Sequence, residues 1–405
     1  MPGSTMSRSD GDPLHLALAG ACALALAMAI GRFAYTPMLP PMLESGGLTL
    51  AGAGVVASSN FAGYLAGALL ATRAFFAADR VLWLRAGIVL SVASTAAMAL
   101  EAGTAGWAAL RFVAGAASAF VLVYTSGMIF EVAARHARPM LGSLVYSGVG
   151  VGIALSALVV FAGRSAGFDA PTLWLAMGAI AAALALAPWR SLTLAAPGRH
   201  GGDGSGAAAP PPGAAAALRR LIVAYACLGF GYVITATFIV VMVRRLPNAP
   251  VWEFWAWMTV GLAGAPSNWL WARLAARVGP YRAIVAAFVL EAIGVALAAL
   301  GSGPAAILAG AALLGGTFLA ITALGLSAAR TLVVDKPDQT IARMTVAFSL
   351  GQIAGPALGG WLAERSGSFV SASWLAVAAL LVGAALTASA GRALRAAGSG
   401  TESVT

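Results

Sequence analysis

The chain has 405 residues, of which 60% are hydrophobic and 9% are Asp, Glu, Lys or Arg. Soluble domains average about 45–50% apolar and about 25% charged residues, so a soluble globular protein is excluded. The formal net charge of +10 would favour nucleic-acid binding only if the basic residues gathered on one face. They are instead scattered between hydrophobic runs, which excludes such a surface.

Apolar runs of about 20 residues recur along the chain, and each is long enough to cross a hydrocarbon layer of about 30 Å as a helix. A membrane β-barrel would need short alternating segments, so the sequence predicts an all-α membrane protein. We expect twelve transmembrane helices, at residues 14–38, 51–72, 81–102, 104–130, 139–163, 170–189, 218–243, 251–272, 281–300, 303–327, 341–363 and 371–391. The first run is too long for a secretory signal core and contains Arg32, which favours a retained helix.

The longest polar break separates the sixth expected helix from the seventh. It contains Pro197-Gly198, a Gly-rich run at 201–206 and Pro210-Pro211-Pro212. A segment of this composition cannot bury enough apolar area to order itself, which predicts a linker. We therefore expect an N-terminal six-helix half at 1–190, a cytoplasmic linker at 191–217 and a C-terminal six-helix half at 218–405.

Basic residues between the expected helices are distributed very unevenly. Eighteen of the 24 Lys and Arg residues fall on the side of the two termini, and two, Arg32 and Arg111, lie within helices. The other side holds four, Arg164, Arg244, Arg245 and Arg365. Because cytoplasmic loops carry the excess of Lys and Arg, this bias predicts a multi-pass protein of the bacterial inner (plasma) membrane with both termini cytoplasmic.

Two patterns recur at an offset of roughly half the chain length, about 200 residues. Small residues spaced four apart allow close approach of helix backbones. They occur in the fifth and eleventh expected helices, at Gly148, Gly152 and Ser156 and at Gly351, Gly355 and Gly359. The loops after the second and eighth helices share an Arg/Arg spacing, at Arg80 and Arg85 and at Arg277 and Arg282. These repeats indicate two related halves.

Together these features resemble the major facilitator superfamily over nearly the whole chain. Residues 31–40, Gly-Arg-Phe-Ala-Tyr-Thr-Pro-Met-Leu-Pro, look like the signature of the YbfB/YjiJ family, and residues 60–68 support it. The resemblance implies the major facilitator fold, with twelve transmembrane helices in two six-helix halves. It also implies a cytoplasmic gating loop, for which the candidates are Asp79, Arg80, Arg85, Arg277 and Arg282. That loop motif is only partly kept, since Ala276 stands where an acid is usual.

The same resemblance bears on energy coupling and direction. Arg111 followed by Gly115 is similar to the superfamily's R-x-x-x-G motif, which is often tied to proton coupling. Proton-driven exporters usually carry a Gly-Pro motif in the fifth helix, where this chain has Gly152-Ile153. Uptake and export both remain open.

Arg32 and Arg111 lie well inside expected spans. A guanidinium there costs several kcal/mol unless it meets water, a partner or an anion. Either arginine can bind a carboxylate-like substrate through its planar donor fork. The alternative is structural, with Arg32 bonded to backbone carbonyls or extended to the membrane interface.

Glu291 is the acid nearest the middle of an expected helix, the ninth. A buried carboxyl that gains and loses a proton would serve proton coupling. The superfamily resemblance, however, places the ninth helix away from the central cavity. A neutral Glu hydrogen-bonded to a neighbouring helix is therefore the competing interpretation.

Neutral polar side chains complete the substrate or proton-coupling candidates. Asn60 and Tyr64 share one face of the second helix, four residues apart. Further candidates on other helices are Tyr35, Tyr124, Tyr232, Thr235 and Gln352. Tyr in a membrane helix often only packs, and Thr often bonds its own backbone, so each residue also has a structural interpretation.

These observations predict a secondary active transporter that works by alternating access on a small solute, an organic anion or amphiphilic metabolite, coupled to protons. It would be a monomer in the lipid bilayer that binds no nucleic acid. The sequence contains no nucleotide-binding loop or catalytic set, and Cys22, Cys227 and the three histidines form no metal-site pattern. We therefore expect no cofactor, no metal and no enzyme activity. The alternatives are a non-transporting receptor or scaffold of the same fold, and an intramembrane enzyme.

Overall fold

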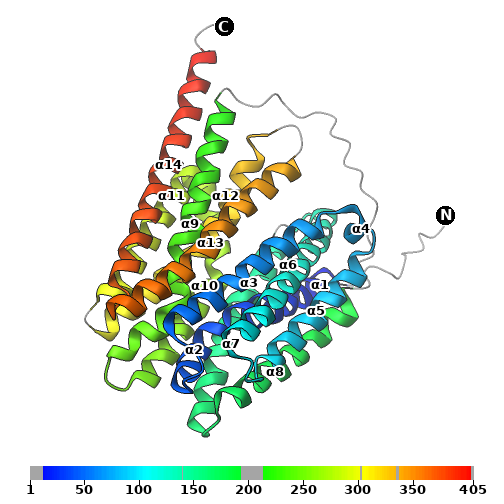
Figure 1. Cartoon of the computed structure of the whole chain (residues 1–405). Coiled ribbons are helices and arrows are strands. Elements are labelled where there is room, and N and C mark those ends of the chain that lie inside the picture. The colour runs from blue at the N-terminus through cyan, green and yellow to red at the C-terminus, as the bar shows by residue number, and fades with distance from the viewer. Residues whose placement is uncertain (1–11, 139, 193–212, 302, 334–336, 403–405) are drawn as a thin grey trace, which may run out of the picture.

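The computed structural model describes residues 12–138, 140–192, 213–301, 303–333 and 337–402. The secondary structure of these residues is helical, without strands (Figure 1). The first part contains α1 (Pro13–Leu24), the π-helix η1 (Ala25–Phe33), α2 (Tyr35–Glu44), α3 (Leu50–Ala71), α4 (Ala74–Ala77), α5 (Arg80–Ala97), α6 (Gly103–Arg135), α7 (Met140–Ser165) and α8 (Ala170–Ser191). The second contains α9 (Ala214–Met242), the 3-10 turn η2 (Val243–Arg245), α10 (Ala249–Val278), α11 (Pro280–Leu300), α12 (Pro304–Arg330), α13 (Pro337–Ser366) and α14 (Val370–Glu402).

Each expected span coincides with an observed helix or helix series, and the first consists of α1, η1 and α2 in succession. Eleven helical segments of the described chain are long and apolar enough to cross a membrane. The 30-residue α10 is not among them, since its tryptophans together with Pro266, Ser267 and Asn268 lower its mean hydropathy. The count of twelve therefore stays a prediction. Most of the expected linker, residues 193–212, lies outside the described residues.

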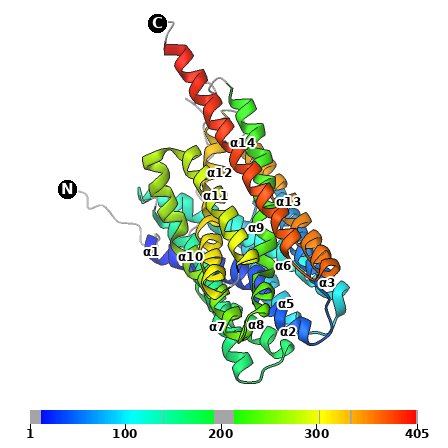
Figure 2. The ribbon, with the colours of Figure 1, turned by 90° about the vertical axis from the view of Figure 1, so that its left-hand side faces the viewer.

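The helices pack into two groups, which we call the first bundle (α1 to α8) and the second bundle (α9 to α14) (Figures 1 and 2). Two helix pairs form most of the contact between the bundles, α3 with α13 and α7 with α10. We call the end of the molecule where α1 begins and α14 ends the terminal face, and the opposite end the distal face. The bundles approach at the distal face and diverge toward the terminal face (Figure 1).

Glycines let helices pack closely within each bundle at equivalent places. A Cβ atom on Gly148 of α7 would lie 2.7 Å from the backbone carbonyl carbon of Ala21 in α1. A Cβ atom on Gly351 of α13 would lie 2.6 Å from the backbone nitrogen of Phe230 in α9. Only glycine fits such approaches, so the repeated small-residue spacing in the sequence marks the same helix contact in both bundles.

The first span is interrupted by η1, where the backbone amide of Ala34 donates to the carbonyl of Ala29 at 2.7 Å. A hydrogen bond from an amide to the carbonyl five residues earlier defines a π-helix, a rare form that is frequent at functional sites. Pro37, just beyond, has no amide hydrogen, so it cannot donate to the carbonyl four residues earlier, that of Phe33. The altered winding presents Arg32 and Phe33 at the middle of the span, next to the second bundle.

Candidate functional site

Arg32 is the buried cation at the contact between the bundles, with only 4% of its surface exposed. Its guanidinium carbon lies 4.4 Å from the ring centre of Tyr64 and 4.6 Å from that of Phe61, both on α3. No carboxylate of the described residues pairs with it, and its Nε has no hydrogen-bond partner. Aromatic faces offset part of the cost of burying the charge, but they do not satisfy the N–H donors.

Arg111 on α6 is also buried, and both of its terminal nitrogens are occupied, although its Nε, like that of Arg32, has no partner. One guanidinium nitrogen donates to the Gly31 carbonyl at 2.7 Å and the other to the Arg32 carbonyl at 2.5 Å. Its guanidinium carbon lies 5.1 Å from the ring centre of Tyr35. These carbonyls belong to η1, where the α-helical pattern of backbone bonds is broken. Arg111 therefore holds the π-helix, whereas Arg32 donates to no backbone carbonyl of the described residues.

Asn60 and Tyr35 support this arrangement from the first bundle. The Asn60 amide donates to the Arg111 carbonyl at 2.9 Å, and its oxygen has no partner. The Tyr35 hydroxyl donates to the Ala53 carbonyl at 3.1 Å. The structure thus brings together five of the predicted site residues, Arg32, Tyr35, Asn60, Tyr64 and Arg111.

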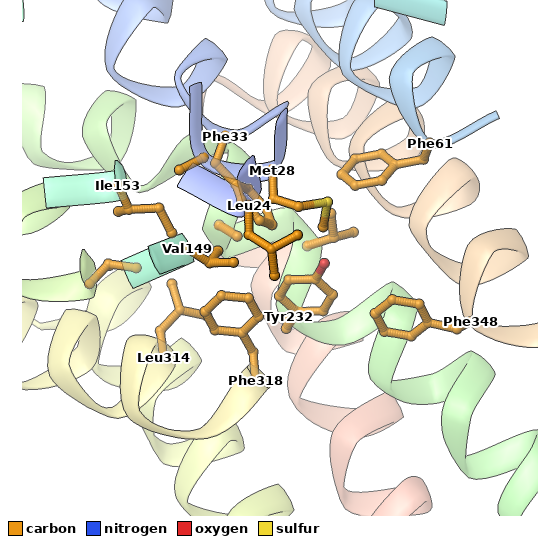
Figure 3. Close-up of a cluster of buried hydrophobic side chains, with 14 of the residues drawn as sticks. Leu24, Met28, Phe33, Phe61, Val149, Ile153, Tyr232, Leu314, Phe318 and Phe348 are labelled. Atoms are coloured by element: carbon orange, nitrogen blue, oxygen red, sulfur yellow. The ribbon is translucent and has the colours of Figure 1, made fainter. Parts of the chain in front are cut away.

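The second bundle presents aromatic rings toward the same region (Figure 3). Tyr232 on α9 is stacked between Phe318 of α12, at 5.3 Å between ring centres, and Phe348 of α13, at 5.8 Å. Phe318 also meets Phe33 of the first bundle edge-on at 5.9 Å. The Gln352 amide donates to the Tyr232 hydroxyl, and its buried oxygen is unpartnered.

Three other predicted residues lie apart from this group. Thr235 is buried on α9 without a hydrogen-bond partner. The Tyr124 hydroxyl donates to the Phe76 carbonyl at 3.0 Å, and its ring lies toward the terminal face. Glu291 on α11 is fully buried, with one carboxyl oxygen bonded to the Thr317 hydroxyl of α12 and the other unpartnered.

One cavity is lined by Arg32, and a second is lined by its neighbour Tyr64. A closed cavity of about 10 Å³, space for one water, lies between the bundles and is lined by Arg32, Arg111 and Thr237 among others. A larger cavity of about 450 Å³ lies between α3, α6 and α13 toward the terminal face, and Tyr64 lines it. Tyr64 therefore lies between the guanidinium of Arg32 and the larger cavity. That volume is within the range of small-molecule sites.

The predicted loop residues have separate roles. Asp79 accepts from the Leu82 amide at 2.9 Å as the N-cap of α5, a common stabilising position for Asp. Arg80 forms an ion pair with Glu131 of α6 at 2.8 Å, and Arg85 lies 4.9 Å from the Trp189 ring centre. Their counterparts in the second bundle, Arg277 and Arg282, are exposed and pair with no carboxylate of the described chain.

Residues 24–388 match a protein-family model described as an uncharacterised MFS-type transporter, YbfB. The chain belongs to this family. A comparison with curated proteins finds no significant match. Among solved structures it is similar to a mutant of the nucleoside transporter NupG, at TM-score 0.66 and 14% identity over 95% of this chain and 99% of that one. The unmutated NupG gives TM-score 0.64 at 14% identity, over 95% and 98%. The resemblance to solved structures concerns the fold.

In this MFS-type transporter, four charged side chains close the distal face. Glu44 and Arg164 come from the first bundle, and Arg244 and Glu253 from the second. Each glutamate forms an ion pair with both arginines, so the signs alternate around a closed ring. The nitrogen–oxygen distances are 2.9 Å for Arg164–Glu44, 3.2 Å for Arg164–Glu253, 2.6 Å for Arg244–Glu44 and 3.6 Å for Arg244–Glu253. We call these four residues the charge ring.

Further hydrogen bonds join the bundles in the distal half of this transporter. The Thr36 hydroxyl donates to the Ala236 carbonyl at 2.7 Å, and the Trp257 indole donates to the Ser156 hydroxyl at 3.0 Å. The Glu364 carboxylate accepts from the Ala51 amide at 2.6 Å. The charge ring and these bonds join the bundles on the distal side, where a cavity of about 230 Å³ remains beside Arg164 and Glu253. The larger cavity, of about 450 Å³, lies on the terminal side.

Sequence reasoning missed the charge ring and the aromatic side chains around Tyr232. Glu44 and Glu253 lie near helix ends, where solvation or a local ion pair is the default, and no local pattern indicates that Arg164 lies 120 positions from Glu44 and 89 positions from Glu253. Phe318 and Phe348 could not be told apart from the other apolar residues of their helices. The altered winding of η1 has no sequence signal, apart from an arginine and a proline within one apolar run.

Proposed function

We propose that this chain is a secondary active transporter that moves a small organic anion across the bacterial inner membrane by alternating access, with proton coupling and both termini in the cytoplasm. The observation that carries the proposal is the unpaired guanidinium of Arg32, buried where the two bundles meet. A buried charge of this kind costs several kcal/mol in a membrane unless a ligand or water meets it. An anionic substrate supplies both the counter-charge and the hydrogen-bond acceptors.

Alternating access is supported by the uneven contact between the bundles. The distal side is closed by the charge ring and by direct hydrogen bonds, whereas a cavity separates α3 and α6 from α13 on the terminal side. Rocking the bundles about the level of Arg32 would exchange these two conditions and expose the same site to the other side. The structure then represents a state closed on the distal side.

The proton has two candidate positions, Glu291 and the charge ring. Glu291 is bonded to Thr317, whose hydroxyl also donates to the Leu313 carbonyl. The single hydroxyl proton of Thr317 can be donated to only one acceptor, the Leu313 carbonyl. A protonated, neutral Glu291 then donates its own proton to the Thr317 oxygen, so both hydrogen bonds are satisfied. The ring glutamates, in contrast, hold the two bundles together through charge. We propose that protonation of Glu44 or Glu253 couples the proton to opening of the distal side.

The direct test reconstitutes the full chain into liposomes and measures flux of small radiolabelled carboxylates with and without a proton gradient, in both directions. We expect gradient-dependent anion flux in the wild type and none in Arg32→Gln. Arg365→Gln is the matched control, since this exposed arginine lies against Trp361 away from the site. If no carboxylate moves and none raises the thermal stability of the protein, a non-transporting receptor or scaffold becomes the better reading.

A further inference from the structure

The surroundings of Arg32 restrict the kind of anion that fits. Aromatic rings approach this point from both bundles, Phe33 and Phe61 from the first and Phe318, Tyr232 and Phe348 from the second (Figure 3). Phe318 and Tyr232 are nearly parallel, with 9° between their planes. Flat rings gain extra stabilisation against such surfaces compared with saturated rings of similar size.

A second polar group lies on the other bundle. Gln352 is completely buried and its side-chain oxygen has no hydrogen-bond partner, while its amide donates to the Tyr232 hydroxyl. Arg32 is connected to this pair through ring contacts, since its guanidinium carbon lies 5.5 Å from the ring centre of Phe33, which meets Phe318, the ring stacked on Tyr232. The region between the bundles thus offers a donor fork at one end and a free acceptor at the other, with ring faces between them. A buried acceptor without a partner is costly, and a ligand hydroxyl or amino group would satisfy it.

Resting on the proposed function, we infer that the transported anion is a flat aromatic monocarboxylate that carries a hydroxyl or amino group away from its carboxylate. The carboxylate binds the guanidinium of Arg32, and the hydroxyl or amino group donates to the Gln352 oxygen. The face of the ligand ring lies over the edges of Phe318 and Tyr232, because the facing surfaces of these two rings already stack on each other. The ligand reaches Arg32 from the 450 Å³ cavity after the Tyr64 ring, which lines that cavity and contacts Arg32, moves aside.

The test is equilibrium binding of radiolabelled 4-hydroxybenzoate to the purified full chain, with competition by three compounds. Benzoate lacks the hydroxyl, cyclohexanecarboxylate lacks the flat ring, and 4-hydroxybenzamide lacks the negative charge. We expect benzoate to bind roughly 5-fold or more weakly than 4-hydroxybenzoate, as for one lost hydrogen bond. Cyclohexanecarboxylate should bind about 2- to 10-fold more weakly than benzoate, and the amide should not compete.

Single substitutions assign each preference to its residue. Gln352→Leu should abolish the preference for 4-hydroxybenzoate over benzoate, and Phe318→Leu should abolish that for benzoate over cyclohexanecarboxylate. Arg32→Gln should abolish binding of all three acids, with thermal unfolding as the check that it is folded. Phe161→Leu is the matched control, because Phe161 packs on Phe254 at 4.7 Å outside the site and should leave every preference unchanged.

The outcomes separate this inference from the proposed function. If all three acids bind and are transported equally well, anion transport stands and the aromatic class is wrong. If 4-hydroxybenzoate fails to bind while another carboxylate is transported, the class is again wrong. If no anion binds or moves, both proposals are wrong. Preferences that persist in Gln352→Leu and Phe318→Leu would also overturn the assignment.

Discussion

Two buried arginines near the middle of the first bundle have different environments. Arg111 gives both terminal nitrogens to carbonyls of η1, whereas Arg32 meets aromatic faces and donates to no backbone carbonyl of the described residues. The sequence gives the residue type and the position within an expected span, and neither distinguishes Arg32 from Arg111. The difference arises from which backbone carbonyls the π-helix exposes.

Replacing Arg111 should therefore damage folding rather than specificity. Arg111→Gln removes two charge-assisted hydrogen bonds, worth about 1.5–3 kcal/mol each, and leaves two carbonyls of η1 without partners. We expect a clearly lower thermal unfolding temperature in detergent for Arg111→Gln, and a smaller decrease for Arg111→Lys, which can still serve one carbonyl. Arg32→Gln should unfold near the wild-type temperature. Equal loss of stability in both glutamine variants would contradict this distinction.

Glu291 is expected to be a structural acid. Glu291→Gln keeps the side-chain volume and a donor toward Thr317, so proton-coupled flux and thermal stability should both stay close to wild type. Glu291→Ala creates a cavity and leaves Thr317 without this partner, so it should lower stability by about 2–4 kcal/mol. Flux that becomes independent of the proton gradient in Glu291→Gln would instead identify Glu291 as the coupling site.

Glycines in the helices serve two distinct contacts. Gly351 lets α13 pack on α9 within the second bundle, whereas Gly54 lets α3 approach α13 across the bundles, where a Cβ would lie 2.9 Å from the Pro356 carbonyl carbon. The first contact is part of a folded bundle. The second exists only when the distal side is closed.

Valine at Gly351 and valine at Gly54 should therefore affect different properties of the protein. Gly351→Val should lower thermal stability, while Gly54→Val should leave the bundles folded and open the distal side. The measurement is labelling of Thr237→Cys, whose side chain borders the closed cavity, by a thiol reagent in a background without Cys22 and Cys227. We expect faster labelling in Gly54→Val than in the unsubstituted background. Unchanged labelling in a stable Gly54→Val protein would show that this approach does not control closure.

Sequence periodicity predicted the helices well because a continuous apolar run of about 20 residues has one low-energy solution in a membrane. The glycine spacing also predicted close approach at Gly148 and Gly351. The winding of η1 was missed, since a π-helix differs from an α-helix by a shift of one hydrogen bond, which apolar side chains do not encode. Of the site, Arg32, Asn60 and Tyr64 were predictable as polar groups in a span. Phe318 and the charge ring depend on contacts between bundles, which no local pattern specifies.

If the charge ring couples the proton as proposed, the two bundles form a gate that weakens in acid. Glu253 is faced by Arg164 of α7, Arg244 of η2 and Glu44 of α2. The ring is stable while both glutamates are ionised, and protonation removes the attraction between the bundles. Acidification should therefore favour opening of the distal side.

The same Thr237→Cys label tests this dependence. Lowering the pH from about 7.5 to about 5, toward the ordinary range of Glu titration, should speed labelling relative to an exposed reference cysteine in place of Glu101. This reference corrects for the smaller thiolate fraction at low pH. In a Glu44→Gln, Glu253→Gln double variant, relative labelling should be fast at both values. A relative rate that falls on acidification would contradict the proposed coupling.

The composition of the charge ring has an electrical consequence. Each bundle contributes one arginine and one glutamate, so separating the bundles in the ionised state leaves each side of the gate with zero net charge. Moving an elementary charge through the membrane potential is worth about 2.3 kcal/mol per 100 mV. Because the ionised gate carries no net charge, voltage should act on opening only through the proton that the ring takes up, and otherwise on the substrate and Arg32. Currents recorded from reconstituted protein would then report the charge of the transported species.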